Sequence, residues 1–293
     1  MKFDFLKRQD SHFKTGLEFF KNAKPSQAIT EVKKHPEQNP DDRDAHYLLA
    51  ECYLRLDQPD EVCKELDIVQ KIDPGYDMGY YLKAIALSSK GSYEEALGEL
   101  KKGERIDPEN ENIRFEMGKA LIRAGKAKEA LAEFRAVLKV DPFNQEAITG
   151  CGSALTLMGR EEEGMLEYLK AKSINPKNPN VYMRIGRLYT QLGRLDEALE
   201  ELSMAIKVSH GHGLLYRDIA VVYEKKGMID EAIREYKKGI RQAPFSPGLH
   251  ADLGDLYHKK GMFEEALREY KRARKINPEY RLSENGIKML SSY

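Results

Sequence analysis

Residues 111–144 read ENIRFEMGKALIRAGKAKEALAEFRAVLKVDPFN. A first series of apolar residues at helical spacing ends at Gly125, and a second series ends at Pro142. Glycine commonly follows the last turn of a helix, and proline cannot continue one. The stretch therefore predicts two helices that are joined by a short turn.

The same punctuation recurs along the chain with a period of 34 residues. Prolines that follow this period are Pro40, Pro74, Pro108, Pro142, Pro176, Pro244 and Pro278. Glycines that follow it are Gly91, Gly125, Gly159, Gly193, Gly227 and Gly261. A fixed period of this length is typical of stacked helical repeats. We therefore expect eight repeats over 9–280, namely 9–42, 43–76, 77–110, 111–144, 145–178, 179–212, 213–246 and 247–280.

The ends and two irregular positions carry predictions of their own. Residues 1–8 are a lead-in, and 281–293 are expected to form a short capping helix through Leu282, Ile287 and Leu290, because terminal repeats need a cover. The first repeat contains Pro36, which predicts a shortened second helix. The sixth repeat lacks its terminal proline, which predicts a hinge near 209–213.

Two repeat positions are occupied almost entirely by small residues. In the first helices they are Gly16, Ala50, Ala84, Gly118, Gly152, Gly186, Ala220 and Gly254. In the second helices they are Ala28, Ala96, Ala130, Gly164, Ala198, Ala232 and Ala266, with Val62 as the larger exception. Glycine inside a helix costs about 1 kcal/mol relative to alanine. Close contact between helices at these positions is the compensation that we expect.

Composition excludes several classes of function. The 48 basic residues balance the 48 acidic ones, so the chain offers no excess positive charge to nucleic acid or an anionic membrane. Three cysteines without a CxxC pair favour a reducing compartment. The start of the chain lacks the apolar run of a signal peptide, and no stretch is apolar enough for a membrane span. We therefore expect a cytoplasmic protein.

Catalytic and cofactor motifs are not found. The sequence contains no phosphate-binding glycine loop, no GxSxG and no HExxH, and the repeat period leaves no room for an inserted catalytic loop. We predict no enzyme activity, no cofactor and no metal site. His210 and His212 could together hold a divalent ion, but structural zinc usually needs four ligands. Whether they bind a metal stays open.

The 34-residue hairpin with a small residue, an aromatic, an alanine and a terminal proline resembles the tetratricopeptide repeat. Residues 179–212 and 247–280 match this pattern best. The resemblance implies an all-α, right-handed superhelical solenoid of antiparallel helix hairpins, whose first helices line a concave groove that binds a peptide, a helix or another protein. The RNA-binding pentatricopeptide family is a rival, but it has a 35-residue period and a basic face.

The partner-binding residues are predicted on the first helices of the N-terminal half. There the groove-facing positions are mostly apolar, whereas in the last four repeats they are mostly charged. The predicted site consists of Phe13, Leu17, Tyr47, Met78, Tyr81, Ile85, Phe115 and Ile122. An apolar strip of this kind is typical of a contact surface. Packing between neighbouring repeats is the alternative explanation for the same residues.

The function that we predict is a non-enzymatic scaffold or adaptor that binds another protein or peptide. No three consecutive repeats carry the Lys, Asn and Arg set by which chaperone-binding members of the family hold a carboxylate. One alternative is a self-assembling homo-oligomer. An alternative of another class is a regulatory or ligand-sensing subunit that uses the hinge near 209–213. The sequence identifies neither the partner nor the oligomeric state.

Overall fold

The computed structural model describes residues 11–34, 41–209, 213–280, 284–287 and 289, and these contain helices and turns but no strand. The chain divides into two compact units, Met1–Gly159 and Arg160–Tyr293. Unit 1 contains α1 (Ser11–Lys21), α2 (Pro25–Val32), α3 (Arg43–Arg55), α4 (Pro59–Ile72), α5 (Asp77–Ser89), α6 (Tyr93–Ile106), α7 (Glu111–Arg123), α8 (Ala127–Val140) and α9 (Gln145–Leu157). Unit 2 contains α10 (Glu161–Ile174), α11 (Pro179–Gln191), α12 (Leu195–Ser209), α13 (Gly213–Lys225), α14 (Ile229–Gln242), α15 (Pro247–Lys259) and α16 (Phe263–Ile276).

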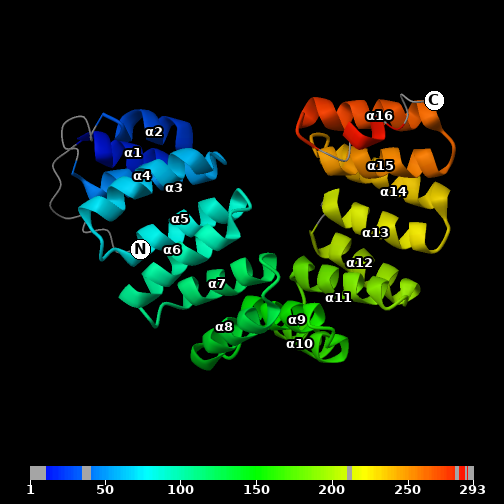
Figure 1. Cartoon of the computed structure of the whole chain (residues 1–293), viewed down its shortest axis with the longest axis horizontal. Coiled ribbons are helices and arrows are strands. Elements are labelled where there is room, and N and C mark those ends of the chain that lie inside the picture. Colours follow the sequence, from blue (N-terminus) through cyan, green and yellow to red (C-terminus); the bar gives the residue numbers. More distant parts are fainter. Residues whose placement is uncertain (1–10, 35–40, 210–212, 281–283, 288, 290–293) are drawn as a thin grey trace. The chain divides into compact units, whose positions relative to one another are not determined.

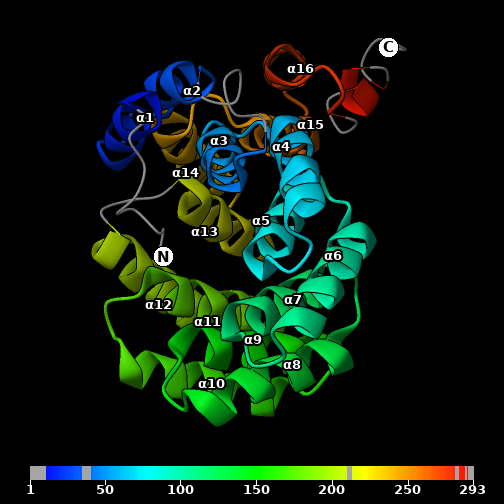
Figure 2. The same cartoon turned by 90° about the vertical axis from the view of Figure 1, so that its left-hand side faces the viewer.

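Within each unit, consecutive helices of a repeat pack as hairpins, and the hairpins stack in chain order. In unit 1, α3 packs against α4, α5 against α6, and α7 against α8. The second helix of each hairpin also packs against the first helix of the next one, so that α4 contacts α5 and α6 contacts α7. Figure 1 and Figure 2 show this succession of helices within unit 1. The predicted all-α solenoid of helix hairpins is confirmed.

The turn inside each hairpin needs a left-handed residue. Six repeats supply a glycine with φ between 72° and 83°. The first two repeats have no glycine there, and Ala23 (φ 55°) and Asp57 (φ 54°) adopt the same conformation. For an L-residue with a Cβ atom this conformation costs about 1 to 2 kcal/mol, although aspartate tolerates it better than alanine.

The small-residue position of the first helices marks a close helix crossing, as predicted. A Cβ atom on Gly118 would lie 2.6 Å from Cε1 of Phe134, and one on Gly254 would lie 2.7 Å from Cε1 of Tyr270. Phe134 and Tyr270 occupy one repeat position on the second helices, and both are buried. The large side chain that fills the space opposite each glycine therefore comes from the partner helix of the same hairpin.

The structure describes the ends of the chain only in part. Helix α2 has 8 residues, against 14 in α4, and it ends at Val32, before Pro36. Residues 284–287 are helical, and Ile287 packs against the core cluster that contains Tyr270. The lead-in 1–8, Pro36, Leu282, Leu290 and residues 210–212 of the expected hinge lie outside the described residues.

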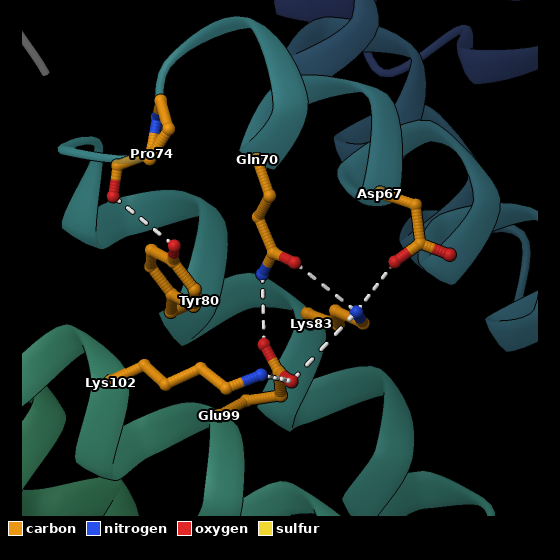
Figure 3. A network of polar contacts seen from close by, with 7 residues as sticks. All are labelled: Asp67, Gln70, Pro74, Tyr80, Lys83, Glu99 and Lys102. Atoms are coloured by element: carbon orange, nitrogen blue, oxygen red, sulfur yellow. Dashed lines mark hydrogen bonds and ion pairs between the residues drawn. The ribbon is translucent and has the colours of Figure 1, made fainter.

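One glutamate recurs at the same position of every repeat, directly before the large second-helix residue: Glu31, Glu65, Glu99, Glu133, Glu167, Glu201, Glu235 and Glu269. Its partners vary. Glu65 contacts Nδ1 of His46 at 2.6 Å, and Glu99 accepts hydrogen bonds from Gln70 Nε2 at 2.8 Å and Lys102 Nζ at 2.7 Å. Figure 3 shows the Glu99 network, which links α4 and α6 through Lys83 and Gln70. Glu99 thus joins neighbouring hairpins, whereas Glu65 joins the two helices of one hairpin. This glutamate position was not singled out from the sequence.

Candidate functional site

The eight predicted partner-binding residues divide into two groups by burial. Phe13, Leu17 and Tyr47 are 2%, 7% and 1% exposed and belong to the core cluster around α1–α4. Met78, Tyr81, Ile85, Phe115 and Ile122 are only half-buried. Among the eight predicted residues, only the five on α5 and α7 therefore keep surface that a partner could contact. We call these five half-buried residues the α5–α7 strip.

Four of the five strip residues pack against the core clusters of unit 1. Tyr81, Phe115 and Ile122 pack against the cluster that contains Leu87, Met117 and Leu121, and Met78 packs against the cluster around α3 and α4. The rings of Phe115 and Phe134 are 5.7 Å apart and tilted by 60°. These four strip residues are thus held in part by the core and remain in part open to solvent. Both explanations given for these residues, repeat packing and partner contact, are physically compatible.

Glu51 on α3 adds an ionisable group beside the strip that the sequence prediction did not include. It occupies the same repeat position as Ile85, one hairpin earlier. Its Oε2 atom is buried and has no hydrogen-bond partner in the described part of the chain. Burial raises the pKa of the Glu51 carboxyl to about 7, although the positive charge of Arg55 acts in the opposite direction.

Arg55 does not neutralise Glu51 directly, because its guanidinium group is engaged elsewhere. Its Nη1 atom donates to the carbonyl oxygen of Phe20 at 2.8 Å, and its Cζ atom lies 3.5 Å from the centre of the Phe20 ring. This cation–π contact fixes the guanidinium against α1. Glu51 is therefore an acidic group without a direct ion pair among the described residues.

Further negative charge surrounds the aromatic residues of the strip. Burial raises the pKa of the Tyr81 hydroxyl, and the carboxylates of Glu116 and Glu146 raise it further. Lys119 compensates Glu116 in part, with its Nζ atom 2.7 Å from Oε1. The strip thus combines aromatic and aliphatic side chains with acidic neighbours, and the Nζ atom of Lys119 lies 5.5 Å from the centre of the Phe115 ring.

The first helices of unit 2 carry more charge, but their charges pair with one another. Arg187 on α11 donates from Nε to Oδ2 of Asp218 on α13 at 2.8 Å. Arg217 on α13 bonds Asp252 on α15 in the same way. The charged face predicted for the last four repeats is therefore largely a ladder of ion pairs that joins successive first helices.

The described residues assemble neither a metal site nor a reactive thiol. No set of three His, Cys, Asp or Glu side chains is placed to hold a metal ion there. Burial raises the pKa of the Cys52 thiol to about 12, and it also raises the pKa of Cys63, which disfavours reactive thiolates. His210 and His212 lie outside the described residues. Among the described helices, none combines the length and apolar character that a membrane span requires.

Family models show what the chain is related to. Models described as tetratricopeptide repeat match residues 13–77, 87–149, 179–209, 215–245 and 247–280. Together these matches cover most of the chain. No curated protein matches it.

Several solved structures have a similar fold. A tetratricopeptide repeat protein from Parabacteroides merdae gives a TM-score of 0.67 at 16% identity, covering 85% of this chain and 98% of that one. A chain of the APC/C hetero-tetramer Cut9–Hcn1 gives a TM-score of 0.62 at 13% identity, covering 91% of this chain and 52% of that one. The present chain thus spans about half the length of that matched chain. Human IFIT1, solved as a dimer with m7Gppp-AAAA, gives 0.60 at 19% identity, covering 92% and 69%. At these identities the likeness concerns the fold alone.

Proposed function

The chain belongs to the tetratricopeptide repeat family, and from this premise we propose that it is a non-enzymatic scaffold that binds a peptide, a helix or another protein on the first helices of unit 1. Repeats of this family generally serve protein interaction. The observation that carries the proposal is the α5–α7 strip, in which five apolar side chains on neighbouring first helices are only half-buried. Contiguous apolar surface of this kind usually marks a contact site.

The strip suits a protein partner better than RNA. A peptide or helix supplies apolar side chains that fill the spaces between Tyr81, Ile85 and Phe115. An RNA ligand, such as the one in the IFIT1 structure, carries a phosphate backbone that basic side chains must neutralise. Here the net charge is zero, and carboxylates border the strip.

Affinity capture with matched variants tests the proposed function. The wild-type chain, Ile85→Ala and Phe143→Ala are each used to capture proteins from the native lysate. Phe143 is 73% exposed on the turn before α9 and serves as a control outside the strip. We expect proteins that the wild type and Phe143→Ala retain and that Ile85→Ala loses. Equal capture by all three chains would contradict a binding site at the strip.

Light scattering over a concentration series addresses the homo-oligomer. If the strip receives a second copy of the chain, the mass rises with concentration, and Ile85→Ala suppresses this rise. A mass that stays monomeric throughout excludes self-assembly and leaves a separate partner.

A further inference from the structure

The charged residues at the repeat position of Glu51 allow a direct comparison. Lys119, Arg187 and Asp255 occupy the same position on α7, α11 and α15. Lys119 pairs with Glu116, Arg187 pairs with Asp218, and Asp255 accepts a hydrogen bond from Tyr270 Oη at 2.6 Å. Glu51 is the member of this set whose buried oxygen has no partner in the described part of the chain. A buried, unpaired acceptor costs free energy, so Glu51 is expected to bind a donor from outside.

The surroundings of Glu51 determine what that donor should be. Tyr47, one helical turn before Glu51 on α3, meets Tyr76 edge-on with the ring centres 5.3 Å apart, and Met78 packs against the core cluster that contains Tyr47. Aromatic and aliphatic side chains therefore lie close to this acidic group, and Glu146 adds negative charge at Tyr81, whereas Glu116 is paired with Lys119. An anionic ligand would meet repulsion at Glu51 and at Glu146. A cation attached to an apolar segment meets both requirements, because its charge pairs with Glu51 while its neighbours cover the strip.

We propose that Glu51 is the counter-ion for a Lys or Arg side chain of a partner peptide whose flanking apolar side chains pack on Met78, Tyr81 and Ile85. This inference rests on the proposed function and specifies the chemistry of the partner. It assigns the basic side chain to α3 and the apolar side chains to α5. The partner is thus a basic, amphipathic segment rather than an acidic or neutral one.

The first experiment selects peptides without assuming their sequence. A displayed library of random 12-residue peptides is selected on the full-length wild-type chain, on Glu51→Gln and on Glu129→Gln. Glu129 is an exposed residue of α8, so its variant changes the net charge equally without touching the strip. We expect the wild type and Glu129→Gln to enrich a Lys or Arg flanked by apolar residues. Glu51→Gln should keep the apolar preference and lose the basic one.

Other outcomes of the selection separate the two proposals. An acidic or uncharged consensus, or a basic consensus that Glu51→Gln preserves, overturns the assignment to Glu51 while the scaffold function stands. A wild-type chain that enriches no sequence removes the basic-peptide proposal and also weighs against peptide recognition as the function. The variant removes an unpaired buried charge, so its folding is not at risk.

A binding measurement then isolates the pair. The selected peptide and a copy with norleucine in place of its Lys are titrated into the wild type and Glu51→Gln, with fluorescence anisotropy as the readout. We expect Glu51→Gln to weaken binding of the Lys peptide at least about tenfold and to leave the norleucine peptide unchanged. Equal weakening of both peptides would mean that Glu51 acts on the fold rather than on the cation, and would overturn the proposal.

Residues 1–10, MKFDFLKRQD, also combine basic and apolar side chains. A synthetic peptide of this sequence is therefore added as a competitor. If it displaces the selected peptide with equal affinity, the strip is assigned to the chain's own amino terminus or to a second copy, and the proposal for a separate partner fails. If it does not compete, the separate partner is supported.

Discussion

A Cβ atom on Gly186 of α11 would lie 2.6 Å from Cγ of Leu202 on α12. This separation is below any ordinary carbon–carbon contact, so only glycine fits the crossing without movement of Leu202. The relationship explains why a residue that disfavours helices stands in the middle of α11.

Leucine at position 186 should therefore destabilise unit 2. Overpacking of a helix crossing costs about 1 to 3 kcal/mol, and Leu202 cannot withdraw easily because it is fully buried. The matched control is Gly98→Leu on α6, where a Cβ atom meets nothing within 4 Å. We expect a lowered melting temperature for Gly186→Leu and an equal or higher one for Gly98→Leu. An unchanged midpoint for Gly186→Leu would refute the close crossing.

Ala23→Gly should stabilise the first hairpin. Ala23 has φ of 55°, and removal of its Cβ atom relieves about 1 kcal/mol of backbone strain. The reverse change, Gly125→Ala at the equivalent turn of the fourth repeat, should cost a similar amount. Urea denaturation of the three proteins tests this pair of opposite effects. If both substitutions changed the free energy of unfolding in the same direction, the two turns would not share one conformation.

Glu51 should make the stability of the chain depend on pH. The pKa of its carboxyl is about 7 in the folded protein against an ordinary value of 4.5, so the folded state holds the proton more tightly than the unfolded state. Its contribution is favourable at low pH and is lost as the pH rises through this interval. After allowance for partial exposure, the loss is on the order of 2 kcal/mol.

The comparison of wild type with Glu51→Gln isolates this effect from other carboxyl groups. We expect the glutamine variant to be more stable than the wild type at pH 8, with the difference shrinking towards pH 4.5. Denaturation at several pH values measures it. If the difference in stability between the two proteins does not change with pH, the pKa of the Glu51 carboxyl is not raised in the folded protein.

Arg217→Ala should destabilise unit 2, because it leaves the carboxylate of Asp252 half-buried without its partner. Loss of one member of such a pair costs about 1 to 3 kcal/mol. Arg234 forms an exposed pair with Glu231 within α14, and Arg234→Ala should change stability by less than about 0.5 kcal/mol. Equal effects of the two substitutions would contradict a structural role for the ladder between first helices.

The fold could be predicted from sequence because its signals repeat. One hairpin with a glycine turn and a terminal proline is ambiguous, but eight repeats in one register, of which six have the glycine and seven have the proline, define the helices and the crossing at Gly186. The burial of each strip residue could not be predicted in the same way. Tyr47 and Phe115 share a repeat position, yet Tyr47 is 1% exposed and Phe115 is half-buried. Their exposure depends on neighbouring hairpins, whose side chains differ between repeats.

The repeat pattern also could not predict that Glu51 lacks a hydrogen-bond partner in the described part of the chain. Asp255 stands at the same repeat position and carries the same charge, but Tyr270 of the neighbouring helix supplies its hydrogen bond. The corresponding second-helix residue of the second repeat is Leu66, which has no hydroxyl group. Whether an acidic side chain is satisfied thus depends on pairs of residues in different helices, which a period alone does not reveal.

The central claim is that a partner binds the α5–α7 strip, and Tyr81 at its middle tests it most directly. Melting temperature and partner affinity are measured on one preparation of Tyr81→Ala, with the partner or selected peptide that the wild type binds. We predict affinity reduced at least about tenfold with most of the helical content retained, because aromatic anchors dominate such contacts. A lowered melting temperature with undiminished affinity would show that Tyr81 only packs the repeats together, and would contradict the account.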